Sequence, residues 1–545
     1  MPNDNTNTHY NWFLIFLIIL ILIVSALHLS SINNEINGLG GDNAGYVLLA
    51  KSLSSLNGYR YFVPGAPLET HYPPVFPLLL APAIWLFGIN FAAMHTVVVL
   101  CELALLIFLF LFFKKTAGKW IALSSCLIFA LNPFVNASLV RILSEFPYML
   151  ITAIVIFMQD IGERQPTKLT LHSLWLPLFI SLAYLTRTAG LSILVSYVLY
   201  MIWRRNFRLL FAGLPILLGP RLIWMWWIRQ AGTAENYANR LWLKNRYNPA
   251  EGNASLADLC DRIWTNIENI YSGINNFLIP THYPQTIFLG GVLISLIILG
   301  IIVRKVEKKE GLMDFYVAVY VGLLLLWPVY EPRKLMLIMP FVYLYFFVGL
   351  TWFFSYIFQS LNKLLTKPLP QELKNLVCVI FSLICIGSQL PKTMEISKLR
   401  NTPLDYPPKT EKNNVFSIDW SHYIESYSWV KGGVLKANVV PWANYLYMST
   451  IAQQFTPPNA VIIARKDSIT SLYSHRYALK YSFTTDVETQ KRHILDNNVD
   501  YILFDELFRD KYISLFPLIK QNPQAFSLVK RQGNTMLLKV LSDKL

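Results

Sequence analysis

The chain has 545 residues, of which 54% are hydrophobic and only 14% are charged. These proportions exclude an ordinary soluble globular protein and a disordered chain, and they indicate a polytopic membrane protein. The formal net charge of +15 is compatible with a nucleic-acid partner. However, much of the excess lies in short basic loops between apolar segments, where it sets membrane topology, so no nucleic-acid partner is expected.

The first apolar segment is expected to be retained as a span. Residues 1–11 contain no Lys or Arg, and no small-x-small cleavage site is evident near the end of the segment, so the features of a signal peptide are missing. Of the five cysteines, only Cys260 lies in a polar loop. Neither a disulfide framework nor a CxxC metal site is therefore predicted.

Eleven apolar runs are interpreted as membrane spans. They cover residues 12–30, 91–113, 120–137, 142–160, 169–186, 188–203, 207–228, 286–303, 313–330, 334–358 and 375–391. A shorter run at 74–88 would reach only about 22 Å as a helix, against a hydrocarbon core of about 30 Å. Length alone does not exclude it, because a few of the eleven runs are little longer.

Basic loops settle the topology, because Lys and Arg collect on the cytoplasmic side. If 74–88 does not cross and the N-terminus is inside, every short basic loop falls on that side: 114–119, 162–168, 204–208, 304–310 and 363–374. If 74–88 crosses, all of them move outside. We therefore expect 74–88 to be a short re-entrant or interfacial helix.

This topology places four regions on the non-cytoplasmic side: the loop 31–73, the turn before Glu145, the loop 229–285 and the tail. The expected division is a membrane domain at 1–391 and a C-terminal domain at 392–545. The tail has buried-strand patterns at 460–465 and 500–505, a helical pattern at 487–498 and a hairpin pattern at 526–540. Such alternation predicts a small α/β domain.

Asp42 is the first candidate site residue. It follows Gly40 and Gly41 and precedes the apolar-periodic run "NAGYVLLAKSLSSL", so it can be a first-turn acid that complements the helix dipole. In a helix, Tyr46 would lie on the same face, four residues later, and the pair could line a sugar site. Local sequence leaves both interpretations open.

The segment "ETHYPPVFPLLLAP" (69–82) carries the next candidates, His71 and Tyr72. Pro73 and Pro74 fix the entry to the short helix, since proline suits a first helical turn. A helix that dips without crossing would hold His71 and Tyr72 near the membrane surface. A rigid turn and a binding role are both compatible with this segment.

Charged residues at the outer ends of later spans form a further set: Glu145, Arg187, Glu331 and Arg333. Glu145 could pair with Arg141 four residues earlier as a structural salt bridge, and boundary charges can snorkel. With Asp42, however, all map to one membrane face. Their convergence favours a functional site. Glu102, in the middle of a span, is left out of it.

The order of these motifs resembles the GT-C glycosyltransferases. It runs "GGDNAGYVLLAKSL", "HYPPVFPLLLAP", "SEFPYML", "LAYLTRTAGL", "YEPRKLMLIMP" and "PNAVIIAR…NNVDYILFD". The likeness is greatest to the protein-mannosyltransferase-like branch, which includes the bacterial lipid A aminoarabinose transferase and lipopolysaccharide sugar transferases. It covers nearly the whole chain in motif order, and each motif is short.

The resemblance implies a multi-pass protein of the bacterial inner membrane, with a GT-C core of about eleven transmembrane helices and the site and C-terminal domain on the non-cytoplasmic side. It implies transfer of a sugar from a polyprenyl-phosphate carrier to a glycolipid, lipopolysaccharide, glycan or protein acceptor. Asp42 matches the acidic residue of the family's first outer loop, and Glu145 matches a second acidic position.

Two departures from the family pattern bear on the site. Many relatives carry a pair of acidic residues where this chain has Asp42 alone, so a divalent metal is left open and neither a metal nor another cofactor is assigned. The Arg-Tyr expected in the late motif is Arg333-Lys334 here. A tyrosine contact is thus missing and an additional cation is present.

The residue types fit this chemistry. An acceptor hydroxyl that attacks the anomeric carbon needs a base, and we expect Asp42 to be that base, with Glu145 as a second acidic or positioning group. The departing prenyl phosphate needs cations, for which Arg187, Arg333 and Lys334 are the candidates. Tyr46, His71, Tyr72 and Glu331 are the remaining expected binding residues. Direct displacement would invert the anomeric centre.

Three other functions stay open at the level of sequence. A polysaccharide polymerase or ligase with a pyrophosphate-linked donor also has many spans and a large outer loop. A transporter or flippase would use the charges along a translocation path, although such proteins typically show internal repeats and broken helices, and neither is evident here. A non-catalytic scaffold is the third.

Overall fold

The structure is a computed structural model that describes residues 5–32, 41–162, 171–231, 241–245, 251–279, 286–363, 370, 372–400, 433–507 and 510–545. Parts of the predicted loops lie outside these residues, namely 33–40, 163–170, 232–240, 246–250, 280–285, 364–369 and 401–432. Two of the basic loops used to predict topology, 162–168 and 363–374, therefore lie largely outside the described residues.

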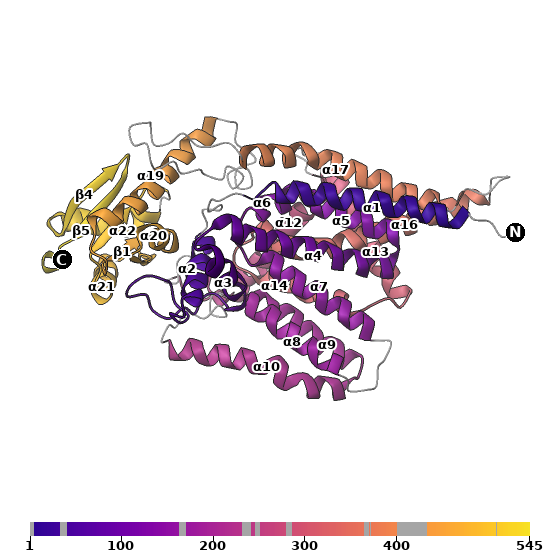
Figure 1. The fold of residues 1–545 in the computed structure, drawn as a ribbon, viewed down its shortest axis with the longest axis horizontal. Helices are drawn as coiled ribbons and strands as arrows, with labels where there is room; N and C mark the ends of the chain where they lie inside the picture. Colours follow the sequence, from indigo (N-terminus) through magenta and orange to yellow (C-terminus); the bar gives the residue numbers. More distant parts are fainter. Residues whose placement is uncertain are drawn as a thin grey trace.

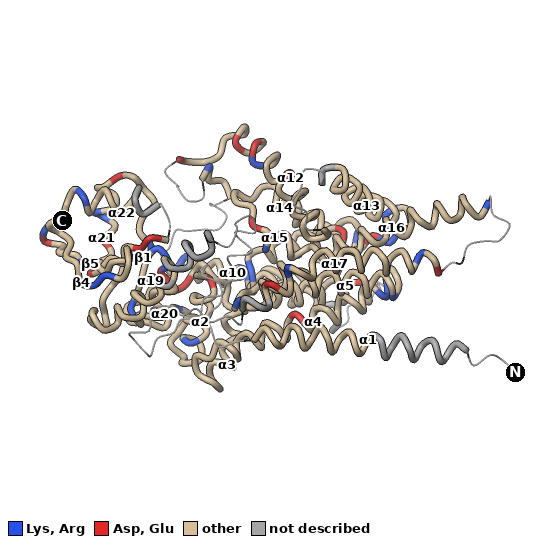
Figure 2. Tube along the Cα trace, turned by 90° about the horizontal axis from the view of Figure 1, so that it is seen from above, with Lys and Arg blue, Asp and Glu red and all other residues tan. Residues whose placement is uncertain are grey.

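The molecule consists of a long helical bundle with a small α/β unit at one end (Figure 1). Helices α2 and α3 lie at the end of the bundle that faces this unit. Charged residues are sparse along the bundle helices, and they gather near the bundle ends and on the α/β unit (Figure 2). This separation is what a membrane-embedded bundle requires, because charges are costly in the hydrocarbon core.

The first half of the bundle contains α1 (Asn5–Leu29), α2 (Asp42–Ser54), α3 (Val75–Phe87), α4 (Phe91–Ala117), α5 (Lys119–Ala130), α6 (Pro133–Leu139), α7 (Glu145–Gly162), α8 (Leu171–Thr186), η1 (Thr188–Gly190) and α9 (Leu191–Trp203). The second half contains α10 (Phe207–Gln230), α12 (Leu256–Leu278), α13 (Thr286–Val306), α14 (Leu312–Leu326), α15 (Pro332–Leu335), η3 (Met336–Ile338), α16 (Met339–Asn362) and α17 (Leu373–Arg400).

Six described helices are long and apolar enough to cross a membrane, and the bent pair α5–α6 would make a seventh. Shorter apolar helices cover Leu17–Leu29, Val75–Phe87, Trp175–Thr186, Thr188–Trp203 and Leu312–Leu326. The predicted number of about eleven is reached when all of these except α3 also cross. The predicted fold class, a mainly α polytopic membrane protein with a small α/β unit, is confirmed.

Two predicted spans are interrupted at proline. The run 120–137 is expected to be continuous, but α5 and α6 meet at an angle of 59°, because Pro133 has no backbone N–H to continue α5. The Asn132 side chain caps α6 by accepting from the Phe134 N–H at 2.9 Å. The run 313–330 ends at Leu326 because Trp327, which precedes Pro328, is extended (φ −71°, ψ 133°).

Close backbone contact joins α13 and α16. A Cβ added to Gly300 would lie 1.9 Å from the Tyr345 carbonyl oxygen, and one added to Gly349 would lie 2.0 Å from the Leu296 carbonyl oxygen. Only glycine fits at both positions. Small residues of this kind let membrane helices approach and gain van der Waals contact, which drives association where lipid supplies no hydrophobic gain.

A buried polar pair joins α1 to α4. Nδ1 of His28 lies 2.8 Å from Oε2 of Glu102, and Nε2 lies 3.0 Å from the Ala130 carbonyl oxygen. Both side chains are fully buried. This pair explains Glu102 as a structural partner of the first span.

The C-terminal unit contains α19 (Gly433–Phe455), β1 (Val461–Ala464), α20 (Asp467–Ser474), β2 (Tyr477–Leu479), α21 (Val487–Asp496), β3 (Tyr501–Phe504), α22 (Asp510–Gln521), η4 (Pro523–Ala525), β4 (Phe526–Gln532), β5 (Thr535–Val540) and η5 (Ser542–Lys544). Its sheet has the order β2-β1-β3-β5-β4. β1 is parallel to β2 and β3, whereas β5 is antiparallel to β3 and β4.

The strands predicted at 460–465 and 500–505, the helix at 487–498 and the hairpin at 526–540 are all present. The short edge strand β2 is an addition that the sequence pattern does not predict. The expected domain boundary at 392 falls inside α17, which continues to Arg400. The division of the chain at that residue therefore stays a prediction.

Candidate functional site

Asp42 is the first residue of α2. Gly41 precedes the helix with φ of 94°, a left-handed backbone conformation that glycine adopts without strain. The acid therefore lies in the first helical turn, where its charge complements the helix dipole. Its side chain is 35% exposed, so the carboxylate is anchored at the helix start and is still reachable from outside.

Tyr72 donates a hydrogen bond from its hydroxyl group to Oδ1 of Asp42, at 3.0 Å. The turn that presents Tyr72 is held by Glu69, whose Oε1 accepts from the backbone N–H groups of Thr70, His71 and Tyr72. Tyr59 adds a hydrogen bond from its hydroxyl to the Tyr72 carbonyl, at 2.7 Å. The rigid-turn interpretation and the site interpretation of this segment are thus compatible.

Helix α2 is shaped to receive the Tyr72 ring. A Cβ added to Gly45 would lie 2.9 Å from Cε2 of Tyr72 and 3.0 Å from the Tyr61 hydroxyl oxygen. The Tyr46 ring packs at 4.8 Å from the Tyr72 ring, and the His71 ring packs edge-on at 4.8 Å on Tyr72. Tyr46, His71 and Tyr72 therefore gather beside Asp42, as expected.

Arg333 links three carboxylates. Its Nη1 lies 3.3 Å from Oδ2 of Asp42 and 3.8 Å from Oε1 of Glu145, and its Nε donates to Oε2 of Glu331 at 2.6 Å. The contact with Asp42 spans 291 residues of sequence. A planar guanidinium can serve several oxygens at once in this manner, which a lysine ammonium does less well.

Glu145, the first residue of α7, is 2% exposed and pairs with Arg187 at 3.1 Å. The helical i,i+4 geometry that would pair Glu145 with Arg141 is absent, because residues 141–144 are not helical. Apart from the ion pair with Arg187, neither carboxylate oxygen of Glu145 has a hydrogen-bond partner among the described residues. A buried acceptor of this kind is costly unless something binds to it.

Ser144 joins Tyr46 of α2 to Arg187, and it is not among the predicted site residues. Its hydroxyl accepts from Nη1 of Arg187 at 3.0 Å and lies 3.1 Å from the Tyr46 hydroxyl. It is fully buried. No local pattern distinguishes this serine, because its role depends on contacts with residues 98 positions before it and 43 positions after it.

Lys334 completes the set of predicted cations. Its Nζ donates to Oε1 of Glu331 at 2.9 Å and lies 4.8 Å above the Trp327 ring. The structure therefore brings all nine predicted side chains into one cluster. Within it, three carboxylates (Asp42, Glu145 and Glu331) face three cations (Arg187, Arg333 and Lys334).

The electrostatic surroundings keep Asp42 ionised. Burial alone would raise the pKa of Asp42, but Arg333, His71 and the hydrogen bond from Tyr72 outweigh it, and the pKa lies below its ordinary value. Burial likewise raises the pKa of Glu331, and Arg333 and Lys334 together lower it strongly. Both groups are carboxylates at neutral pH.

These carboxylates do not suit a divalent metal. Each of the three is already in contact with a guanidinium or ammonium group, and a dication would have to displace Arg333 to reach them. Among the described residues, no group of three His, Cys, Asp or Glu side chains is arranged to hold an ion.

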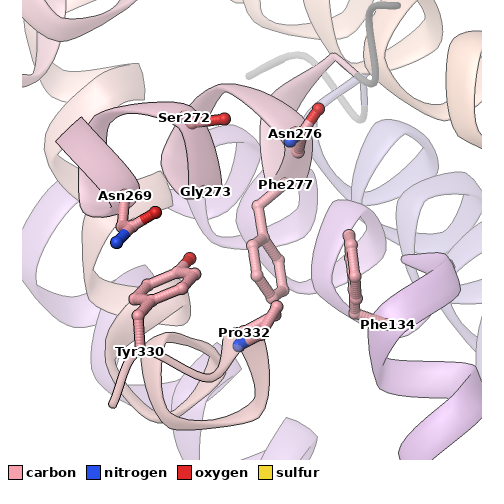
Figure 3. Close-up of a pocket in the computed structure, with 8 residues that line it drawn as sticks. All are labelled: Phe134, Asn269, Ser272, Gly273, Asn276, Phe277, Tyr330 and Pro332. Carbon is pink, nitrogen blue, oxygen red and sulfur yellow. The ribbon is translucent and has the colours of Figure 1, made fainter. Parts of the chain in front are cut away.

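A small pocket of about 90 Å³ opens next to the cluster (Figure 3). It is bordered by α12, by Phe134 of α6 and by Tyr330 and Pro332, which flank Glu331. The Tyr330 ring points into it, and its hydroxyl has no hydrogen-bond partner among the described residues. None of the nine predicted side chains lines this pocket.

The C-terminal unit also reaches the cluster, a contact that the sequence does not predict. The buried Ser468 hydroxyl donates to the Gly41 carbonyl oxygen at 2.7 Å. Cδ of Lys466 lies 4.0 Å from the position that a Cβ on Gly41 would take. Helix α20 thus packs against the start of α2, beside Asp42.

No protein-family model matches the sequence, and no curated protein matches it. Solved structures do match. ArnT from Cupriavidus metallidurans bound to undecaprenyl phosphate aligns with 97% of this chain and 98% of its own, at 12% identity and a TM-score of 0.51. Its apo structure aligns with 98% and 99% of the two chains, at 12% identity and a TM-score of 0.52.

The archaeal oligosaccharyltransferase AglB from Archaeoglobus fulgidus, in complex with an inhibitory peptide and a dolichol-phosphate, is also similar. It aligns with 97% of this chain and 77% of its own, at 12% identity and a TM-score of 0.55. Both proteins are GT-C superfamily members. The predicted resemblance is thereby confirmed over almost the full length, and the chain has the fold of the GT-C membrane glycosyltransferases.

Proposed function

We propose that the protein is a membrane glycosyltransferase that moves a sugar from a polyprenyl-phosphate carrier to an acceptor hydroxyl, with Asp42 as the base. The observation that carries the proposal is the arrangement around Asp42: an ionised, partly exposed carboxylate held by Tyr72 and Arg333 inside a cluster of opposite charges. The similar structures support the donor class, since ArnT is bound to undecaprenyl phosphate and AglB to a dolichol-phosphate.

In the proposed reaction the acceptor oxygen bonds to the anomeric carbon and its proton moves to Asp42. The bond between that carbon and the phosphate oxygen breaks, and the phosphate leaves with the electron pair. Arg333 and Arg187 stabilise the charge that develops on the phosphate. Glu145, whose Oε1 lies 3.1 Å from Nη1 of Arg187, accepts a hydrogen bond from a hydroxyl of the sugar or acceptor and positions it.

Binding of the donor phosphate also makes Asp42 more basic. In the structure Arg333 divides its guanidinium between Asp42 and Glu331. A phosphate that binds Arg333 weakens the attraction between Arg333 and Asp42. Because that attraction lowers the pKa of Asp42, donor binding raises the pKa and makes the carboxylate a better base when it is needed.

The proposed location is the non-cytoplasmic face of a bacterial inner membrane. Support comes from the charge at the two ends of the bundle. Glu145 begins α7, whereas the opposite end carries Lys114 and Lys115 of α4 and Arg304 of α13. Lys and Arg collect on the cytoplasmic side, which supports an outer position for the Asp42 cluster and the C-terminal unit. Glycolipid, lipopolysaccharide and protein acceptors all fit this location.

The test is transfer from a labelled polyprenyl-phosphate sugar by purified protein in lipid nanodiscs with envelope lipid as acceptor. Asp42→Asn is expected to lower kcat by about 10²–10⁴-fold, the usual contribution of a general base. Asp160→Asn is the matched control, because Asp160 pairs with Lys115 at the far end of α7. Full activity of folded Asp42→Asn protein would remove Asp42 as the base.

A further inference from the structure

The C-terminal unit carries a basic side chain to the Asp42 cluster. Lys466, which directly precedes α20, runs alongside Gly41, and the neighbouring Ser468 binds the Gly41 carbonyl. The Lys466 Nζ lies 5.9 Å from the centre of the Trp442 ring of α19. The backbone of Lys466 is fixed as well, because its N–H donates to the Tyr445 hydroxyl at 3.0 Å.

The balance of charge between the cluster and the lipid phosphate shows why a further positive charge is useful at this site. In the bundle, Arg187, Arg333 and Lys334 are each within ion-pair distance of Glu145, Asp42 or Glu331, so these six groups are neutral in sum. A sugar-linked polyprenyl phosphate is a diester with one negative charge. The departing polyprenyl phosphate is a monoester with up to two. The negative charge at the site therefore grows during transfer, and these six groups offer no excess of positive charge.

The C-terminal unit brings further basic side chains to the start of α2. Arg465 and Lys480 act electrostatically on Lys466, and Asp42 and Asp467 act on it in the opposite sense. Lys480 itself lies 3.6 Å from Asp467, so these two charges largely offset each other. Lys466, which follows Arg465 in the chain, is the basic residue of this unit that lies beside Gly41.

We propose that Lys466 binds the phosphate group of the lipid that enters the Asp42 cluster, so that the C-terminal unit completes the anion site of the membrane domain. The inference rests on the proposed function in that it takes the ligand to be a phosphate-bearing lipid. That phosphate can belong to the polyprenyl carrier or to a phosphorylated glycolipid acceptor, and the experiment distinguishes the two.

The proposal also predicts how phosphate binding depends on pH, because Lys466 titrates. Burial lowers the pKa of Lys466 to about 8; Arg465 and Lys480 add to the lowering, whereas Asp42 and Asp467 oppose it. The ammonium form is therefore lost as the pH rises through about 8, and phosphate affinity falls with it. An arginine at this position keeps its charge over the same range.

The experiment measures binding of polyprenyl monophosphate to the full-length protein in nanodiscs, with neutral polyprenol as the reference lipid. Lys466→Met is expected to weaken phosphate binding about tenfold at pH 7, the effect of one charge-assisted hydrogen bond, and to leave polyprenol binding unchanged. Lys466→Arg is expected to bind as wild type at pH 7 and to retain its affinity at pH 9, where wild type weakens.

Lys530→Met is the control for loss of a charge from the same unit, because Lys530 lies on β4, at the sheet edge opposite β2. A parallel titration uses a phosphorylated glycolipid and its dephosphorylated form. Weakening of the glycolipid alone by Lys466→Met assigns the lysine to the acceptor phosphate. If Lys466→Met binds the polyprenyl monophosphate and the phosphorylated glycolipid as tightly as wild type does, the role of Lys466 is overturned and the proposed function is not. No binding of either phosphate lipid by wild type overturns the proposed function as well.

Discussion

Removal of Arg333 is the perturbation with the widest consequences, because this residue contacts Glu331, Asp42 and Glu145 at 2.6, 3.3 and 3.8 Å. In Arg333→Met, Glu145 keeps Arg187 and Glu331 keeps Lys334, whereas Asp42 keeps Tyr72 and loses its arginine partner. The phosphate also loses the Arg333 guanidinium, whose N–H groups can donate two parallel hydrogen bonds to it. Loss of one such preorganised electrostatic group typically lowers kcat about 10²–10³-fold, or about 2.7–4 kcal/mol.

The pH dependence of Arg333→Met has a definite sign. Burial raises the pKa of Asp42, and Arg333 is the largest influence that lowers it. Without Arg333 the pKa rises, so Asp42 becomes protonated at a higher pH than in wild type. The acid limb of kcat/KM, which reports the free enzyme, should shift upward. Arg333→Lys keeps the charge but loses the fork, so a loss of about tenfold is expected.

The assay is sugar transfer in nanodiscs from pH 4 to 8, with wild type, Arg333→Met and Arg333→Lys at equal amounts of folded protein. Arg304→Lys serves as a control, because Arg304 pairs with Asp314 away from the cluster. An Arg333→Met enzyme with a wild-type pH profile and a loss of less than about threefold would refute the role given to Arg333, since removal of a preorganised electrostatic group costs far more.

Three further variants test the supports of the site and fold. Tyr72→Phe removes the donor to Asp42 and should lower kcat/KM about tenfold or more, whereas unchanged activity would leave this hydrogen bond without a role. Gly45→Ala places a Cβ 2.9 Å from the Tyr72 ring; it should reduce activity and lower stability by about 1–3 kcal/mol, unlike Gly322→Ala, whose Cβ meets open space. His28→Leu leaves the buried Glu102 without its partner and should lower the melting temperature, and His28→Leu/Glu102→Leu should recover part of the loss. Equal melting temperatures for the single and double variants would contradict that account.

The convergence of the site was predictable because charges are rare in this chain and topology sorts them. Once the basic loops are assigned to one side, Asp42, Glu145, Arg187 and Arg333 can only lie at the other end of the bundle. The structure brings them together across 291 residues of sequence. Individual pairings were not predictable, because the helical spacing that suggested Arg141 for Glu145 is broken before α7 begins.

Other parts of the site have no signal in the sequence. Ser144 is one of many serines, and only the folded contacts with Tyr46 and Arg187 distinguish it. Lys466 follows a buried strand as many surface lysines do. Its place beside Gly41 depends on how α20 docks on α2, which hydrophobic periodicity does not encode. The break between α5 and α6 was in principle readable from Pro133.

The central claim concerns what happens to the donor, so the most direct measurement counts both products of wild-type protein in sealed proteoliposomes. Labelled polyprenyl-phosphate sugar is supplied with acceptor lipid, and glycosylated acceptor and released carrier are quantified together. The account predicts one polyprenyl monophosphate for each sugar transferred, with both lost in Asp42→Asn. Release of a polyprenyl pyrophosphate, or movement of the labelled lipid across the membrane without a covalent product, would contradict it.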